Sequence, residues 1–68
     1  MDAAIEELRE ALRSNPNYPE AHYNLGGLLV DRGQTEEAVV HYKEALRLKP
    51  DYAEARQRLL ELGVTPPN

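Results

Sequence analysis

The sequence predicts an all-α fold, an α-solenoid fragment of four short antiparallel helices. Three observations predict it. Shifting the chain by 34 residues pairs 12 identical residues, among them Pro16 with Pro50 and Leu25 with Leu59, and a repeat of this length is typical of helical solenoids. Apolar residues recur at spacings of three and four, which places them on one face of a helix. Proline or glycine follows each apolar segment and ends the helix there.

The first half of the chain predicts two helices, over about 2–14 and 19–32. Pro16 ends the first helix. Pro19 suits the first turn of the second, where a missing backbone N–H has no partner to lose, and Gly33 suits a left-handed cap at its end. The apolar face of the first helix is Ala4, Ile5, Leu8, Ala11 and Leu12, and the core positions of the second are Ala21, Leu25, Leu28 and Leu29.

The second half of the chain repeats this plan. The predicted helices span about 35–48 and 53–62, and a non-helical tail covers 63–68. Thr35 is expected to cap the third helix, Pro50 to stop it and Gly63 to end the fourth. Their expected core residues are Ala38, Val39, Tyr42, Ala45, Leu46 and Leu48, followed by Ala55, Leu59 and Leu62. Small residues at Gly26, Ala38 and Ala45 would let neighbouring helices come close.

Composition narrows the range of functions. The net charge is −4, and no cluster of lysine or arginine is long enough to follow a phosphate backbone, so we expect no nucleic-acid partner. The longest apolar run, Leu28 to Val30, is far too short to span a bilayer, so we expect no membrane partner and a soluble protein. The chain has no cysteine, which suits a reducing compartment, and we expect it to be cytoplasmic.

One segment carries a family resemblance. It reads His22-x2-Leu25-Gly26-x2-Leu29, then Ala38-x3-Tyr42, then Pro50. This pattern resembles the tetratricopeptide repeat. The resemblance implies one full repeat over 19–52, preceded by a half repeat and followed by a half repeat or capping helix, in a single domain over 1–68. The implied structural positions are Leu25, Gly26, Ala38, Tyr42, Ala45 and Pro50.

Two residues of the fourth helix depart from the pattern of the second. Leu60 stands where Gly26 stands one repeat earlier, and Arg56 replaces His22. In the family the first of these positions is small because a following helix packs there. We therefore expect the fourth helix to be a terminal capping helix.

A second stripe of residues, spaced by three and four and not used for the core, runs along the second and fourth helices. In the family the first helix of each pair lines a concave groove for extended peptides or partner helices, so the resemblance implies that this stripe is a peptide-binding surface. The candidate binding residues are Tyr23, Asn24, Gly27, Val30, Asp31, Gln57, Arg58 and Glu61. Tyr23 offers aromatic area, Asn24 and Gln57 offer amides for a peptide backbone, and Arg58 can pair with a carboxylate.

Acidic residues dominate this stripe. Glu20, Asp31, Glu54 and Glu61 outnumber the single Arg58, which favours a peptide that carries lysine or arginine. Some family members clamp a peptide carboxylate with lysine and asparagine. Asn24 and Arg58 match part of that clamp, but Glu54 and Gly27 do not, so a full clamp is not expected. The alternative, that the stripe is an ordinary solvated surface, stays open at this point.

No residue pattern indicates catalysis. His22 and His41 lie 19 residues apart without a carboxylate spaced to complete a metal site, and we interpret both as packed histidines. Gly26 and Gly27 lack the lysine and serine or threonine of a phosphate loop. Ser14 has no histidine at triad spacing. We therefore expect no enzyme activity, no metal and no cofactor.

Three functional hypotheses remain. The first is a protein-interaction module, or scaffold, that binds a peptide or partner helix in the acidic groove, with a preference for a basic one. The second is a self-assembling structural unit, a homodimer in which the unpaired first helix packs on another copy. Leu60 favours a closed two-fold pairing over a head-to-tail one. The third is an excised or engineered fragment of a longer array with no ligand of its own.

Overall fold

A computed structural model describes residues 3–66, and these residues form four α-helices and no strand. The helices are α1 (Ala3–Ser14), α2 (Pro19–Asp31), α3 (Thr35–Leu48) and α4 (Ala53–Glu61). Their ends lie within one residue of the predicted ranges. Residue 2 of the first predicted helix and residues 67–68 of the predicted tail lie outside the described residues. The predicted all-α fold is confirmed.

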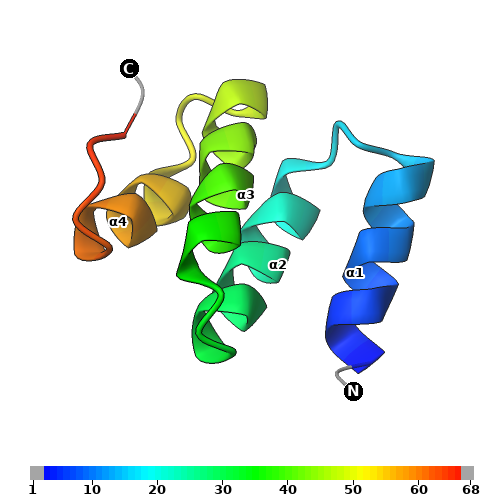
Figure 1. Cartoon of the computed structure of the whole chain (residues 1–68). Coiled ribbons are helices and arrows are strands. Elements are labelled where there is room, and N and C mark those ends of the chain that lie inside the picture. The colour runs from blue at the N-terminus through cyan, green and yellow to red at the C-terminus, as the bar shows by residue number, and fades with distance from the viewer. Residues whose placement is uncertain (1–2, 67–68) are drawn as a thin grey trace.

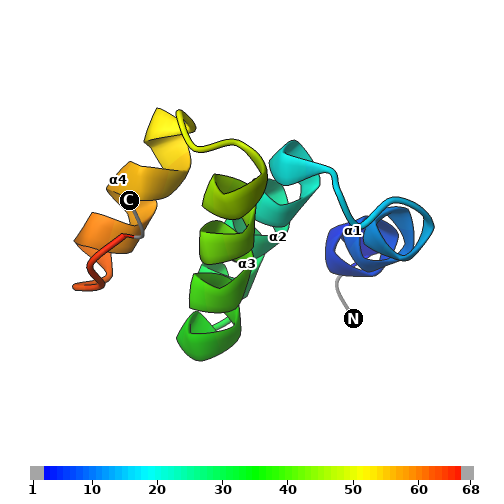
Figure 2. The same cartoon turned by 90° about the horizontal axis from the view of Figure 1, so that it is seen from above.

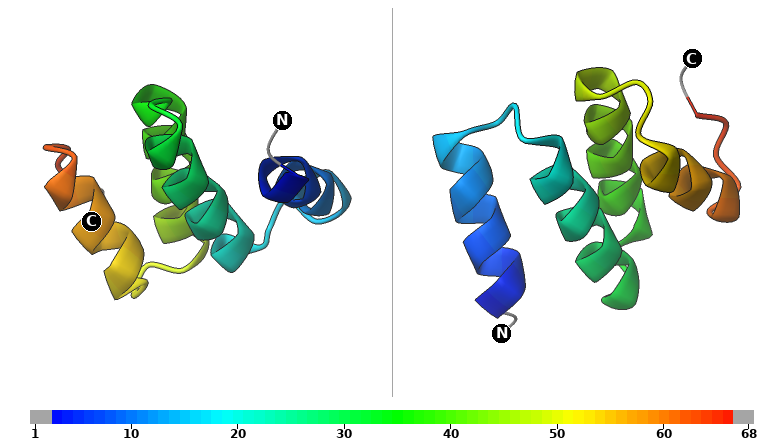
Figure 3. Two further views of the ribbon diagram at one scale, coloured as in Figure 1. Left: turned by 90° about the horizontal axis from the view of Figure 1, so that it is seen from below. Right: turned by 180° about the vertical axis from the view of Figure 1, so that it is seen from behind.

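The helices follow one another across the molecule in chain order; α1, α2 and α3 alternate in direction, and α4 is steeply tilted against α3 (Figure 1). The pairing of α2 with α3 is the most extensive, and α1 packs on α2 while α4 packs on α3. Seen from above, α1 and α4 lie at opposite ends of the row (Figure 2), and the views from below and behind show the same order (Figure 3). The molecule is thin, with dimensions of 31 × 25 × 14 Å. Each helix therefore has a large exposed face.

The core lies where α2 and α3 meet and extends to α4. Its buried apolar residues are Ala21, Leu25, Leu29, Ala38, Tyr42, Ala45, Leu46, Tyr52, Ala55 and Leu59. Four residues that were expected in the core are only partly buried because they sit at the edge of their helix faces: Leu28, Val39, Leu48 and Leu62. α1 has no fully buried residue, since only one side of it meets another helix.

Glycine ends α2 and α4 in the same way. Gly33 and Gly63 both have φ of 78°, the left-handed conformation that glycine adopts most easily. After α2, Gln34 N–H donates to the Leu29 carbonyl at 2.8 Å, and after α4, Val64 N–H donates to the Leu59 carbonyl at 2.9 Å. These are the long bonds of a Schellman cap. The predicted left-handed cap at Gly33 is present.

The predicted cap at Thr35 is wrong. Thr35 is the first residue of α3, Gln34 holds the capping position, and no side chain bonds to the open N–H groups there. The reason lies in the turn before it. Gln34 completes the cap of α2 with its N–H and accepts the Ala38 N–H at 3.1 Å with its carbonyl, so α3 begins immediately and Thr35 falls inside it.

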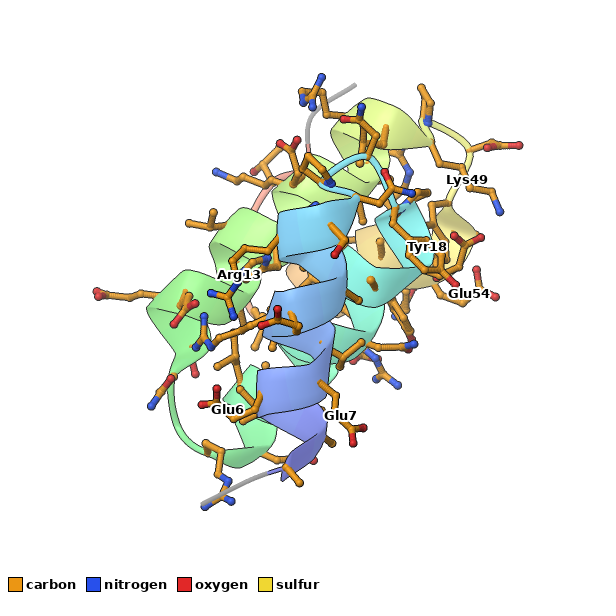
Figure 4. The ribbon with its side chains drawn as sticks, turned by 90° about the vertical axis from the view of Figure 1, so that its right-hand side faces the viewer. Glu6, Glu7, Arg13, Tyr18, Lys49 and Glu54 are labelled. Carbon is orange, nitrogen blue, oxygen red and sulfur yellow. The ribbon has the colours of Figure 1, made fainter. Side chains whose placement is uncertain are left out.

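Charged residues on α1 are distributed as the helix dipole favours, with acidic residues near its start and a basic residue near its end. Figure 4 shows Glu6 and Glu7 on its first half and Arg13 on its second. Arg13 pairs with Glu10, and Arg47 pairs with Glu44 one repeat later. These pairs are solvent-exposed and contribute little to stability.

Candidate functional site

An open groove of about 540 Å³ lies between α2 and α4. Its walls are residues of these two helices and Leu62, and one residue of α3 reaches its floor. The lining residues are Tyr23, Asn24, Gly27, Leu28, Val30, Asp31, Tyr42, Arg58, Glu61 and Leu62. The helical period places the α2 residues on one side of that helix, away from the Leu25 and Leu29 side that faces the core.

Tyr42 links the core of the molecule to the groove. Its ring is buried and lies so close to Gly26 that a Cβ there would meet Tyr42 Cε1 and Cζ at 2.9 Å. Its hydroxyl continues past this contact, and a Cβ built on Gly27 would lie 3.6 Å from it. Burial raises the pKa of Tyr42 above its usual value. The floor of the groove therefore presents a neutral phenol hydroxyl at neutral pH.

Tyr23 stands between two other tyrosine rings. Its ring centroid lies 5.7 Å from that of Tyr42 and 5.2 Å from that of Tyr52, both in tilted arrangements. Tyr23 is partly buried and packs against the hydrophobic core. Its ring therefore supports the fold as well as lining the groove, a double role that the sequence analysis did not assign.

Arg58 already has partners among the neighbouring side chains. It donates to Glu61 at 2.9 Å. Its pKa is raised above the usual value, first by hydrogen bonding to the Tyr23 hydroxyl and then by this contact with Glu61. The same guanidinium, with a smaller contribution from Gln57, lowers the pKa of Glu61. A ligand carboxylate would have to compete with Glu61 for Arg58.

Seven of the eight predicted site residues line the groove together, and Gln57 does not. Gln57 instead lies 3.5 Å from Glu61 Oε2 along the exposed side of α4. Sequence reasoning missed Leu28, Tyr42 and Leu62, which it had assigned to the core. A signal was available for two of them, because Leu28 and Leu62 are equivalent positions 34 residues apart and both lie at the edge of the apolar face.

The predicted acidic stripe divides into two parts. Asp31 and Glu61 line the groove, whereas Glu20 and Glu54 lie outside it, near Tyr52. Burial is the main reason that the pKa of Tyr52 is raised, and the charges of Glu20 and Glu54 add to it. With Arg58 as the counter-charge, the groove itself carries a small negative excess.

The described residues contain neither a candidate metal site nor a candidate membrane span. Over residues 3–66, no group of three or more histidine, cysteine, aspartate or glutamate side chains is placed to hold a metal ion. Within the same range, each helix is too short or too polar to cross a bilayer.

Comparison with known families gave one match. The model of the tetratricopeptide repeat family matches residues 1–53, which is most of the chain. Comparisons with curated proteins and with solved structures found no match. The family match includes α1, α2 and α3 and ends at the first residue of α4.

Proposed function

The chain belongs to the tetratricopeptide repeat family, and we propose that it is an interaction module whose groove between α2 and α4 binds an extended peptide or a partner helix. Tetratricopeptide repeats generally mediate protein–protein interactions. The observation that supports this site is the lining of the groove. A mainly apolar lining carries a few convergent polar groups, the combination that ligand sites commonly have.

The apolar and the polar lining residues of the groove would contact different parts of a ligand. Leu28, Val30 and Leu62 offer apolar contact, while the Asn24 amide can donate to and accept from a peptide backbone. Asn24 is exposed on α2. Such a surface suits a segment that alternates apolar side chains with accessible backbone groups.

The charge of the groove favours a basic ligand. Glu61 is engaged with Arg58, whereas Asp31 stands exposed at the end of α2. Glu20 and Glu54 extend the negative surface beyond the groove. A ligand in which a lysine or arginine lies next to an apolar residue would therefore match both the apolar lining of the groove and the negative charge around it.

A peptide-display selection against the full chain, followed by fluorescence titration of the selected peptides, tests the proposal. Gly27→Leu would fill part of the groove and should weaken peptide binding by roughly tenfold or more, which corresponds to about 1.4 kcal/mol of binding free energy. Asn24→Ala should weaken it several-fold. Gln57→Ala is the matched control, because it removes a similar amide from an exposed position outside the groove.

Two outcomes would contradict the proposal. One is that no peptide is selected, and the other is that the selected peptides bind all four proteins with the same affinity. Circular dichroism of each variant separates lost binding from lost folding. Tyr23→Ala is a poor probe, because Tyr23 also supports Tyr42 and Tyr52.

A second candidate function is self-association through α1. Ile5, Leu8 and Leu12 pack against the core from α1 yet remain only partly buried. A second copy of the chain could cover their exposed portions. Sedimentation over a range of concentrations tests this candidate, and a monomer at high micromolar concentration would remove it.

A further inference from the structure

Two histidines form a pair at the contact between α2 and α3. The Nδ1 atoms of His22 and His41 lie 3.0 Å apart, and the rings are stacked with centroids separated by 5.3 Å. His22 is buried. Its other nitrogen, Nε2, lies 2.9 Å from the Pro16 carbonyl in the turn before α2. The pair therefore ties that turn, α2 and α3 together.

The positions of the protons follow from the partners. A carbonyl oxygen can only accept, so His22 Nε2 must carry a hydrogen. In a neutral His22 the Nδ1 atom is then a bare acceptor, and His41 Nδ1 must donate to it. The geometry thus fixes opposite tautomers for the two rings. A structure in which both rings donate through Nδ1 is incompatible with the 3.0 Å separation.

The surroundings offer a place for one added proton. His41 Nε2 faces Glu37 Oε2 at 3.4 Å, and the same oxygen accepts from Arg9 Nη1 of α1 at 2.7 Å. Glu44 of α3 is also close enough to interact with both rings. A proton on His41 Nε2 would point to Glu37 and leave the bond between the rings intact. A second proton would have to sit on His22 Nδ1, opposite the N–H of His41.

We propose that His22 and His41 form an acid-sensitive latch, which holds α2 on α3 while the pair carries at most one added proton and opens when it carries two. Opening separates the rings, frees the Pro16 carbonyl and weakens the contact of α1 through Arg9 and Glu37. The tetratricopeptide pattern itself does not require histidine at either position.

The burial of His41 sets the sign of the pH effect. Burial is the main cause that lowers the pKa of His41, Glu37 opposes this effect, and the charges of His22 and Arg9 add to it. A lowered histidine pKa means that the unfolded chain binds the proton more readily. Stability is therefore complete above the unfolded pKa of about 6.5 and declines as the pH falls below it. The carboxylates with lowered pKa, such as Glu37 and Glu61, act only in a more acidic range, below about pH 4.5.

Urea unfolding of the full chain from pH 8 to pH 5 tests the latch. The unfolding equilibrium constant of the wild type should rise between pH 7 and pH 5, by up to about tenfold per pH unit for one extra proton bound on unfolding. His22→Asn keeps an acceptor oxygen near the position of Nδ1 for the N–H of His41 but cannot take the second proton, so its unfolding constant should change much less than that of the wild type over this range. Lys43→Asn is the matched control on the exposed side of α3 and should behave as the wild type does.

Two results would overturn the proposal: a wild type that shows no change between pH 7 and pH 5, or a His22→Asn variant that changes as much as the wild type. If His22→Asn does not fold, nitrogen-15 NMR of the wild-type imidazoles decides. Opposite tautomers at neutral pH, with hydrogen on Nε2 of His22 and Nδ1 of His41, support the latch. Two rings with the same tautomer and independent titrations contradict it.

Discussion

α2 and α4 occupy equivalent positions in the 34-residue repeat, but their neighbours differ. Leu25 and Leu59 are both completely buried, so the innermost position is the same in the two helices. Gly26 is buried beneath Tyr42, whereas its equivalent Leu60 is 53% exposed. A helix packs on this position of α2, and Leu60 lacks such cover. The repeat thus sets the inner contact, and the neighbouring helix sets the size of the residue beside it.

The largest effect is expected from exchanging residues at this position. Gly26→Leu gives α2 the residue of α4, and its side chain would overlap the buried Tyr42 ring, at a cost of more than about 3 kcal/mol. The total stability of a chain of 68 residues is roughly 3–10 kcal/mol. We therefore expect Gly26→Leu to be largely unfolded by circular dichroism.

Leu60→Gly is the reciprocal control. It removes an exposed side chain and should cost only about 1 kcal/mol, the usual effect of glycine inside a helix. Equal losses of stability in urea for the two variants would refute the idea that Tyr42 makes the difference between the positions.

The two equivalent tyrosines before α2 and α4 give the next largest expected effect. Tyr52 is 8% exposed, packs against Tyr23 and lies below Lys49 Nζ, which is 4.8 Å from its ring centroid. Tyr18 is 45% exposed. Tyr52→Ala should lower the free energy of unfolding by about 3 kcal/mol, and Tyr18→Ala by less than about 1 kcal/mol. A chemical-denaturation series that gives both the same loss would show that burial does not distinguish the two sites.

The smallest expected effects come from the helix caps, where the two regions are alike. Gly33→Ala and Gly63→Ala each force a side chain into the left-handed conformation and should cost about 1–2 kcal/mol. Space is not the cause, because a Cβ at either position would have nothing within 4 Å. Gly27→Ala is the control within a helix and should be neutral or slightly stabilising. The thermal midpoints of the three variants provide the measurement, and a Gly33→Ala midpoint equal to that of Gly27→Ala would contradict the strain.

Much of this fold follows from short-range signals in the sequence. Pro16, Pro50, Gly33 and Gly63 mark the ends of helices because their backbones restrict or permit particular conformations whatever surrounds them. The prediction for Thr35 was wrong, since a threonine caps a helix only if the preceding turn leaves room for it. The cap of α2 does not leave that room.

The groove was only partly predictable, for a physical reason. Helical spacing assigns Asn24, Gly27 and Asp31 to one face, and these residues do line the groove. Spacing cannot tell that the Tyr42 side chain extends across Gly26 to the floor, or that Arg58 binds Tyr23 and Glu61, because those outcomes depend on side-chain direction between helices. The bond between His22 and His41 was missed for the same reason.

Gly63 ends α4 after nine residues, whereas α2 continues for 13. The difference of four residues is one helical turn, about 6 Å of length. One bank of the groove is thus shorter than the other. Near Arg58, both α2 and α4 would contact a ligand that lies along α2, whereas beyond Leu62 only α2, among the described residues, would contact it. The sequence of the ligand would therefore be recognised more strictly at the Arg58 end than at the other end.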